Sequence, residues 1–451
     1  MSSPAEAAYP DGAELVKAVA GRHRRGTIFK FAFLAALMLA VVALLTLLLK
    51  VIDSSFGYVA LENEVQPREL VADLGYGEDV DLADLSKTDL VALLQQTISN
   101  NVGRRLERDQ RFFDDRLVFE SEAKYAELCA GPEPVSGCSA PARDQAGVYQ
   151  LVVERVVQPT VLQTWTLFET VFSGSEVRAL ADAQYPQAEL VFWSWLSGKF
   201  LVSPQAPDPA VAGVRTAVLG SLWIVAITLL FSFPVGVGAA IYLEEYASDN
   251  RVNRLIQTNI NNLAGVPSII YGMLGLAIFV RALEVFSSGA LFGVGEGTTA
   301  NGRTIVAAGL TLGLLILPII IINSQEAIRA VPRSLRQAGL ALGATKWQTT
   351  RSHVLPNALP GILTGTILAV ARALGETAPL VVVGASTFIT TDPNGPFAKF
   401  TALPIQIFQW TSRPQDEFRN IAAAAILVLL VILLTLNATA VILRNRYARR
   451  I

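Results

Sequence analysis

Two charged residues, Arg372 and Glu376, lie four positions apart in the otherwise apolar stretch 361–383. If a membrane helix begins near Gly361, Arg372 lies about 11 residues in, or about 16 Å, close to the middle of a hydrocarbon layer. A charge there costs roughly 2.5–3.5 kcal/mol, and the spacing places both side chains on one helical face. They form either a self-neutralising ion pair or a charged site on an aqueous path, where the planar arginine fork can bind an oxyanion.

A polar segment punctuated by glycine precedes this charged helix. Residues 334–342 have a helical pattern, and Gly343 is a natural stop because glycine tolerates a left-handed backbone. Thr345 stands three residues before Gln348, the spacing of a capping box that starts a second helix. We expect that helix to end before Pro356, since the residue before proline avoids helical geometry. The pattern predicts a helix–turn–helix elbow, which by itself is also compatible with an ordinary connection between membrane spans.

The composition indicates a polytopic membrane protein with a sizeable polar part. The chain has 451 residues, of which 52% are hydrophobic and 16% charged. Six stretches are apolar enough to span a bilayer as helices: 27–49, 214–243, 263–283, 304–323, 361–383 and 421–443. The first is too long for the apolar core of a signal peptide, so we expect a retained anchor. The predicted fold class is therefore an all-α polytopic membrane protein with six transmembrane helices.

Basic residues fix the expected orientation. They flank the first stretch and recur in segments 244–257 and 324–360 and in the tail RNRYARR, 444–450. With six spans, all of these segments fall on the same side as the N-terminus, which the positive-inside rule makes the cytoplasm. An odd number of spans would break this agreement.

Segment 51–211 differs from the rest of the chain. Acidic residues clearly outnumber basic ones there, so the near-neutral net charge of −2 combines two opposite halves. The segment is long enough for a domain with its own core, which we expect to be mixed or mainly α. Counting spans places it outside the cytoplasm, and the proline-rich stretch 203–210 is predicted to link it back to the membrane.

Both cysteines lie in this outer segment, in the sequence CAGPEPVSGC. Glycine and proline between Cys129 and Cys138 favour a loop, so a loop-closing disulfide is feasible in an oxidising compartment. Two unreactive free thiols are the alternative.

Enzyme signatures are missing from the sequence. The two histidines, His23 and His353, and the two cysteines are too scattered for a metal site. No phosphate-binding G-x-x-x-x-G-K-[ST] loop occurs. We therefore expect a non-catalytic chain that binds no cofactor, and any ATPase must be a separate chain.

The elbow resembles a family. Gln337, Ala338, Gly339 and Gly343, followed by Leu355-Pro356, match the spacing of the E-A-A-x-x-x-G-x9-I-x-L-P loop of ABC importer permeases. The resemblance implies that this loop is a coupling helix that sits in a cleft of the ATP-binding subunit. This chain departs from the pattern where Gln337 replaces glutamate and His353 replaces isoleucine.

Three further motifs narrow the resemblance to permeases of the phosphate-specific ABC importer, the PstA type. They are GVGAAIYLEEYA at 236–247, NLAGVPSIIYGMLGL at 262–276 and ARALGETAPL at 371–380. The resemblance covers about half of the chain, from residue 211 onward. It implies a homologous permease partner, two ATP-binding subunits that use ATP and magnesium, and an extracytoplasmic phosphate-binding protein. It also implies a bacterial inner-membrane location.

The resemblance also implies a division of the chain. A cytoplasmic tail 1–26, a first helix 27–50 and the extracytoplasmic segment 51–211 would precede a permease core, 212–443, that contains five transmembrane helices and the coupling loop 324–360. A basic cytoplasmic tail, 444–451, would follow the permease core. Segment 51–211 resembles an N-terminal extension found in some members.

In this family the charged pair at Arg372 and Glu376 serves transport, so the resemblance favours the pathway role over the ion pair alone. The chemistry suits phosphate: arginine binds the oxyanion, and the carboxylate accepts a hydrogen bond from the proton that phosphate retains near neutral pH. Sulfate has no such proton. Two rival functions are the same architecture for another oxyanion, such as sulfate or molybdate, and a membrane-anchored phosphate sensor.

Overall fold

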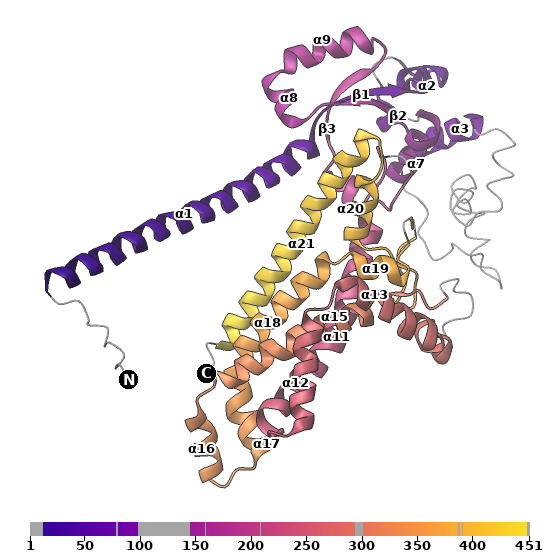
Figure 1. Cartoon of the computed structure of the whole chain (residues 1–451). Helices are drawn as coiled ribbons and strands as arrows, with labels where there is room; N and C mark the ends of the chain where they lie inside the picture. Colours follow the sequence, from indigo (N-terminus) through magenta and orange to yellow (C-terminus); the bar gives the residue numbers. More distant parts are fainter. Residues whose placement is uncertain are drawn as a thin grey trace.

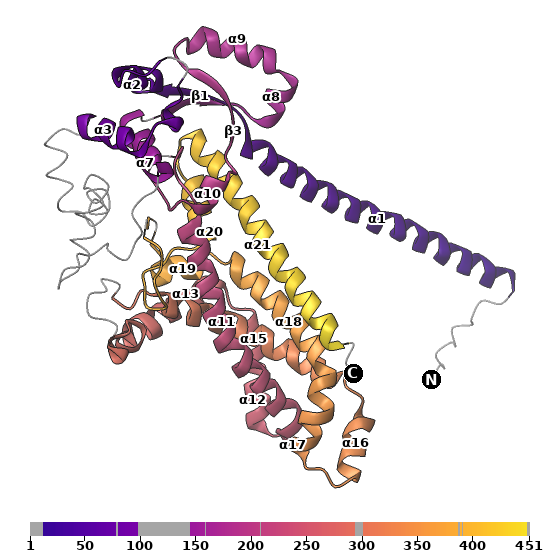
Figure 2. The ribbon, with the colours of Figure 1, turned by 180° about the vertical axis from the view of Figure 1, so that it is seen from behind.

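The computed structural model describes residues 12–77, 80–97, 145–157, 159–207, 209–293, 301–386, 388–389 and 391–448. Figures 1 and 2 show a bundle of long helices with a small sheet domain at one end. The loop between α16 and α17 lies at the opposite end of the bundle, and the C-terminal end of α21 lies on that side too. Helix α1 (Ala13–Ser55) leaves the sheet domain and diverges from the bundle.

Five helical segments are long and apolar enough to cross a membrane, judged by length and composition. They are Arg25–Ser55 in α1, Arg215–Tyr246 in α11 (Arg215–Ile241) and η3 (Tyr242–Tyr246), Ile305–Arg329 as α15, Lys346–Gly375, and Asp416–Arg446 in α21 (Asp416–Ala448). Four predicted stretches, 27–49, 214–243, 304–323 and 421–443, overlap four of these segments, with ends that differ by one to six residues.

The predicted span 263–283 is not a single straight helix. Helix α12 (Arg251–Ala264) ends there, and a second helix, bent by 107° from α12, follows it. This second helix consists of α13 (Ser268–Gly275) and the π-helical η4 (Leu276–Ala282). Pro267 precedes α13 in an extended conformation. This proline explains the break, because it has no N–H to continue the helix before it. The chain thus has six spans only if this bent pair counts as one.

The predicted span 361–383 is wrong in both boundaries. The helix begins as α17 (Lys346–Thr349), passes through η6 (Thr350–Val354) and continues as α18 (Leu355–Gly375). A separate short helix, α19 (Ala378–Val383), follows. Pro379 explains the break, because a proline inside a continuous helix would leave the carbonyl of Gly375 unpaired. Starting a new helix places Pro379 in its first turn, where no N–H is needed.

Helix α15 is the centre of the bundle, packed between α11 and α18 (Figure 2). Its buried face supplies the largest share of a continuous apolar core, including Ile305, Leu312, Ile316 and Ile320. Small residues let neighbouring helices approach it closely. A Cβ added to Gly365 on α18 would lie 2.4 Å from the Asn323 side chain on α15.

The sheet domain has three antiparallel strands in the order β2-β1-β3. β1 (Phe56–Asn63) follows α1 directly, and β2 (Pro159–Thr164) and β3 (Glu189–Ser194) flank it. A second, helical core is built from α2 (Pro67–Asp73), η1 (Leu82–Asp84), α3 (Lys87–Thr97), α7 (Gln145–Val152) and η2 (Val153–Val157). Cys129 and Cys138 lie outside the described residues, so their pairing stays a prediction.

The sheet domain and the helical bundle share one apolar cluster. Val59 and Trp195 of the domain and Phe200 of α10 (Gly198–Val202) belong to the same cluster as Trp410 of α20 (Leu403–Thr411) and Ile421 of α21. Phe200 and Trp410 have ring centroids 6.2 Å apart. The domain is therefore packed onto the ends of α20 and α21.

The proline-rich stretch 203–210, which we expected to be a linker, is held in place. Gln205 is only 1% exposed, donates to Gln409 and accepts from the backbone N–H of Ile389. The N–H of Gly213 donates to the carbonyl of Pro204 over 2.8 Å. These bonds satisfy backbone and amide groups that would be costly to bury unpaired.

Candidate functional site

Arg372 and Glu376 meet at the end of helix α18. The Arg372 Nε lies 3.5 Å from the Glu376 Oε1, and their side chains are 49% and 20% exposed. Arg372 belongs to the last turn of α18, whereas Glu376 is the residue after the helix and has an extended backbone. The two were expected on one face inside a continuous helix. The pair forms instead where the helix breaks, with the guanidinium accessible from outside the chain.

Glu376 lies between the end of α18 and the start of α19, and α19 packs against α13. A Cβ added to Gly272 on α13 would lie 2.7 Å from Pro379 on α19, so these helices touch backbone to backbone. Arg303 supports the other end of α19, because Gly384, with φ +105°, lies against its side chain. Glu376 thus lies in the short connection between α18 and α19, whereas Arg372 extends from the long helix α18. A rotation of α18 against α19 changes the distance between the two charges.

The elbow has the predicted geometry. Helix α16 (Arg333–Ala341) ends before Gly343, whose φ of +82° is the left-handed conformation that favours glycine. The hydroxyl of Thr345 accepts from the N–H of Gln348 over 3.2 Å, and the Gln348 side chain accepts from the N–H of Thr345 over 2.9 Å. Both bonds of the capping box therefore start α17.

The expected end of this second helix at Pro356 is wrong. Leu355 and Pro356 open α18, and the π-helical turn η6 directly precedes them. Proline has no N–H for the preceding turn, and the wider π-helical turn absorbs that mismatch without ending the helix. The second helix of the elbow and Arg372 consequently lie on one helical segment, Lys346–Gly375.

The elbow residues divide into exposed and packed positions. Gln337, Ala338 and Gly343 are exposed, whereas Leu355 and Pro356 are half-buried. Gly339 is buried, because it packs against the Thr349 side chain at a distance that leaves no room for a Cβ. The tip also exposes apolar side chains: Leu340 is 48%, Leu342 88% and Trp347 51% exposed. A compact fold with an apolar tip is suited to docking in a cleft of another protein.

Two ion pairs that sequence reasoning missed anchor the elbow. Arg336 on α16 pairs with Glu245, and Arg329 at the end of α15 pairs with Glu244, both glutamates lying in η3. In the sequence, Arg329 and Arg336 belong to the basic segment 324–360, which indicates orientation only. The signal available in the sequence was the acidic pair Glu244-Glu245, which falls on the same predicted side of the membrane as these arginines.

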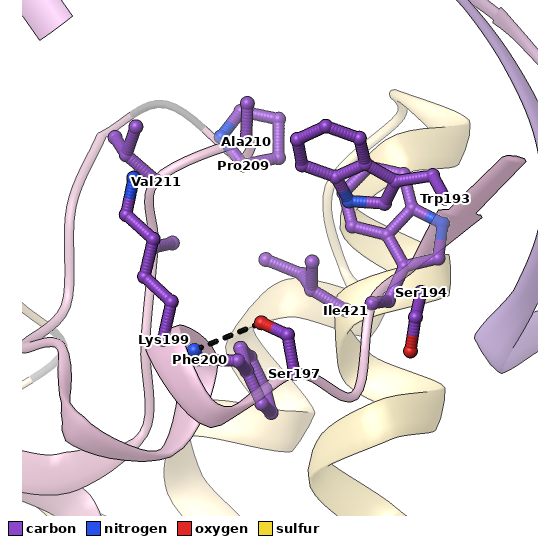
Figure 3. A pocket seen from close by; sticks show the side chains of 11 residues that line it. Trp193, Ser194, Ser197, Lys199, Phe200, Pro209, Ala210, Val211 and Ile421 are labelled. Carbon is purple, nitrogen blue, oxygen red and sulfur yellow. Dashed lines mark hydrogen bonds between the residues drawn. The ribbon is translucent and has the colours of Figure 1, made fainter. Parts of the chain in front are cut away.

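Three cavities lie away from the charged pair. A cavity of about 810 Å³ lies between α11, α18 and α21, but its lining is apolar except for Thr366, Asn437 and Thr439. A second cavity of about 60 Å³ lies where the sheet domain meets α21 (Figure 3). Figure 3 shows Trp193, Lys199 and Ile421 around it, and it has room for only a few water molecules. A third cavity, of about 570 Å³ between α1 and α21, has Lys50 and Arg419 in its lining. None of the three is lined by Arg372 or Glu376.

Comparison with known proteins gives a consistent result. The family described as "Binding-protein-dependent transport system inner membrane component" matches residues 232–451. The "Probable ABC transporter permease protein YqgI" of Bacillus subtilis is 32% identical over 259 residues, which cover 54% of this chain and 83% of that protein. The "Phosphate transport system permease protein PstA 1" of Mycobacterium tuberculosis strain H37Rv is 35% identical over 246 residues, covering 54% and 73%.

One solved structure, a bacterial ABC transporter involved in the import of alginate, has 16% identity and a TM-score of 0.40 over 66% of this chain and 95% of that chain. The extent and identity of the sequence matches, together with the membrane-spanning helices, decide the family. This chain belongs to the binding-protein-dependent transport system inner membrane components, the permeases of ABC importers.

Proposed function

We propose that this chain is one permease subunit of an ATP-driven importer of inorganic phosphate. The observation that carries the proposal is the Arg372–Glu376 pair, 3.5 Å apart at the end of α18 and accessible on the arginine side. The match to phosphate transport permeases of Mycobacterium tuberculosis and Yersinia pestis supports the choice of substrate. The match to YqgI, whose name states no substrate, is equally close and leaves the anion to experiment.

The chemistry of the pair favours a protonated oxyanion. Near neutral pH phosphate carries at least one proton in addition to its charged oxygens. The Arg372 fork can bind two of those oxygens, while Glu376 accepts a hydrogen bond from the protonated one. Sulfate has no proton at this pH, so its oxygens would meet the carboxylate with like charge and no hydrogen bond. The same two residues therefore attract one anion and repel the other.

The helical segment Lys346–Gly375 is the proposed link to ATP hydrolysis. Arg372 lies 26 residues after Lys346, or roughly 39 Å along the helix. An ATP-binding subunit that holds Gln337, Ala338 and Gly343 would move the elbow, and the helix would carry that movement to the arginine. Because Glu376 lies beyond the helix, the movement changes the geometry of the pair and alternates the access of the anion site.

The remaining parts of the importer follow from this assignment. Two ATP-binding subunits that use ATP and magnesium would act on the elbow and on its counterpart in a homologous permease. A phosphate-binding protein would deliver the anion at the sheet-domain end. We propose that both termini are cytoplasmic, that 51–211 lies outside, and that this domain guides the binding protein. Joining the spans without residues 51–211 should then weaken binding-protein affinity; unchanged affinity would reject the guiding role.

The decisive experiment reconstitutes the chain with its partner permease, the ATPase and the binding protein in liposomes. ATP-dependent accumulation of labelled phosphate, suppressed by unlabelled phosphate and little affected by sulfate or molybdate, is the expected result. If sulfate or molybdate at equal concentrations suppressed the accumulation of labelled phosphate, the transported substrate would be assigned as another oxyanion. Failure of the chain to co-purify with any ATPase would instead favour the sensor.

A further inference from the structure

Helix α8 (Leu167–Phe172) exposes an apolar ridge. Phe168 is 51%, Val171 65% and Phe172 77% exposed, and their spacing places all three on one face. The rings of Phe168 and Phe172 are stacked, with centroids 5.7 Å apart and planes 12° from parallel. A ridge of large apolar side chains on a domain surface indicates contact with lipid or protein.

The position of α8 is fixed relative to the end of α1. The N–H of Phe168 donates to the Asp53 Oδ1 over 2.8 Å, and Asp53 is only 5% exposed. The N–H of Tyr58 donates to the Thr170 hydroxyl over 2.9 Å. A Cβ at Gly57 would lie 2.0 Å from the carbonyl oxygen of Trp165, so the chain before α8 lies directly against β1. These contacts attach α8 rigidly to the helix end.

The sequence of α1 gives the depth of that attachment in a bilayer. The charge-free stretch 31–49 covers roughly 28 Å of helix, close to the thickness of a hydrocarbon core of about 30 Å. Lys50 follows it, and its side chain is 70% exposed although it pairs with Asp53. Asp53 lies about one turn, or roughly 5 Å, beyond Lys50. The start of α8 is therefore held within the polar interface of the bilayer.

We infer that Phe168, Val171 and Phe172 insert into the lipid interface of the leaflet on the sheet-domain side. Aromatic side chains are favoured in this layer, and interfacial helices bury their apolar faces about 5–10 Å into it. Figures 1 and 2 place α8 beside the end of α1, on the side of the domain from which α1 leaves. Lys50 pairs with the same Asp53 that accepts from Phe168, and its positive charge suits the phosphate groups of lipids. Lipid is thus the occupant favoured by position and charge.

This contact gives the sheet domain a second support. One side of the domain shares the apolar cluster with α20 and α21. The other side, through α8, would rest on the bilayer next to α1. The domain would be held at a fixed height and tilt above the membrane whether or not a partner is bound.

Spin labels test the depth directly. The full-length chain with Cys129→Ser and Cys138→Ser is labelled at Val171→Cys or at Phe172→Cys, in liposomes of phosphatidylcholine and phosphatidylglycerol. Leu180→Cys is the matched control, because Leu180 is 49% exposed on α9 (Gly174–Gln184), which Figure 1 places farther from α1. Collisions with oxygen, which concentrates in lipid, are compared with collisions with a water-soluble nickel chelate.

We expect a severalfold higher ratio of oxygen to nickel accessibility at residues 171 and 172 than at residue 180. Nickel accessibility at 171 and 172 equal to that at 180 would place the ridge in water and overturn the inference. Shielding of these labels from both reagents would show that protein covers the ridge, which also overturns it. Using two adjacent labels keeps the test valid if one substitution prevents folding.

Discussion

The Arg336 Nη2 lies 2.8 Å from the Glu245 Oε1, which ties the elbow to the π-helical turn that ends the segment Arg215–Tyr246. The same guanidinium donates to the carbonyls of Ile328 and Val331 at the end of α15. One side chain on α16 therefore holds two helix ends. Any movement of the elbow must move both of these helices or break these bonds.

The first prediction concerns this pair. Arg336→Ala should lower the free energy of unfolding by about 1–3 kcal/mol, because Glu245, with a side chain 12% exposed, loses its partner. Arg333→Ala, an exposed position on the same helix, is the matched control and should be near neutral. Unfolding in mild detergent followed by helical circular dichroism measures both variants.

A double-mutant cycle with Glu245→Gln separates the pair from the loss of packing. A coupling energy of about 0.5–3 kcal/mol is expected for residues in direct contact. Additive effects of the two substitutions would mean that the ion pair contributes nothing to holding the elbow.

Arg372→Lys tests the proposed anion site. Lysine keeps the positive charge but loses the planar fork, so phosphate uptake should fall about tenfold or more if the bidentate bond is made during transport. Arg419→Lys is the control, since Arg419 forms an exposed pair with Asp416 in the first turn of α21. Initial rates of uptake into proteoliposomes measure the effect. Wild-type rates in Arg372→Lys would remove this residue from the pathway.

Glu376→Gln tests selectivity rather than binding strength. The neutral amide no longer repels a fully deprotonated anion and can donate to it, so the preference for phosphate over sulfate should fall by roughly tenfold. Competition of unlabelled sulfate against labelled phosphate gives this ratio independently of the amount of active transporter. An unchanged ratio together with unchanged uptake contradicts the role proposed for the carboxylate.

The features that were predictable from the sequence are those set by neighbouring residues. Gly343 and the Thr345–Gln348 capping box depend on backbone conformation within one turn, and both are found as expected. Four long apolar stretches were identified in the same way, since each exceeds the length needed to cross a bilayer. Proline rules were less reliable: Pro379 ends a helix, whereas Pro356 is accommodated by a π-helical turn.

What the sequence did not predict depends on residues far apart in the chain. Arg336 and Glu245 are separated by 91 positions. No sequence pattern near either residue identifies the other as its partner. Strand β1 pairs with β2 and β3, which lie about a hundred residues further along, so the sheet has no hairpin signal. The shared cluster of Phe200 and Trp410 likewise joins segments that were predicted to be separated by a linker.

The last prediction concerns the close packing of α18 against α15. Gly365→Ala should destabilise the chain by about 1–3 kcal/mol, because the added Cβ would lie 2.4 Å from the Asn323 Cβ. Gly375→Ala, on the same helix with no neighbour within 4 Å, should be neutral or slightly stabilising. Unfolding curves in detergent compare the two directly.

A compensating substitution identifies the cause of this destabilisation. Asn323→Gly removes the atoms that the new methyl group would meet, so it should cost less in the Gly365→Ala background than in the wild-type chain. The cost of Asn323→Gly in the wild-type chain minus its cost in the Gly365→Ala background is the coupling energy between the two positions. This coupling energy should be positive by about 0.5–3 kcal/mol. Equal costs in both backgrounds would show that Gly365 is needed for its backbone and not for the close approach of the two helices.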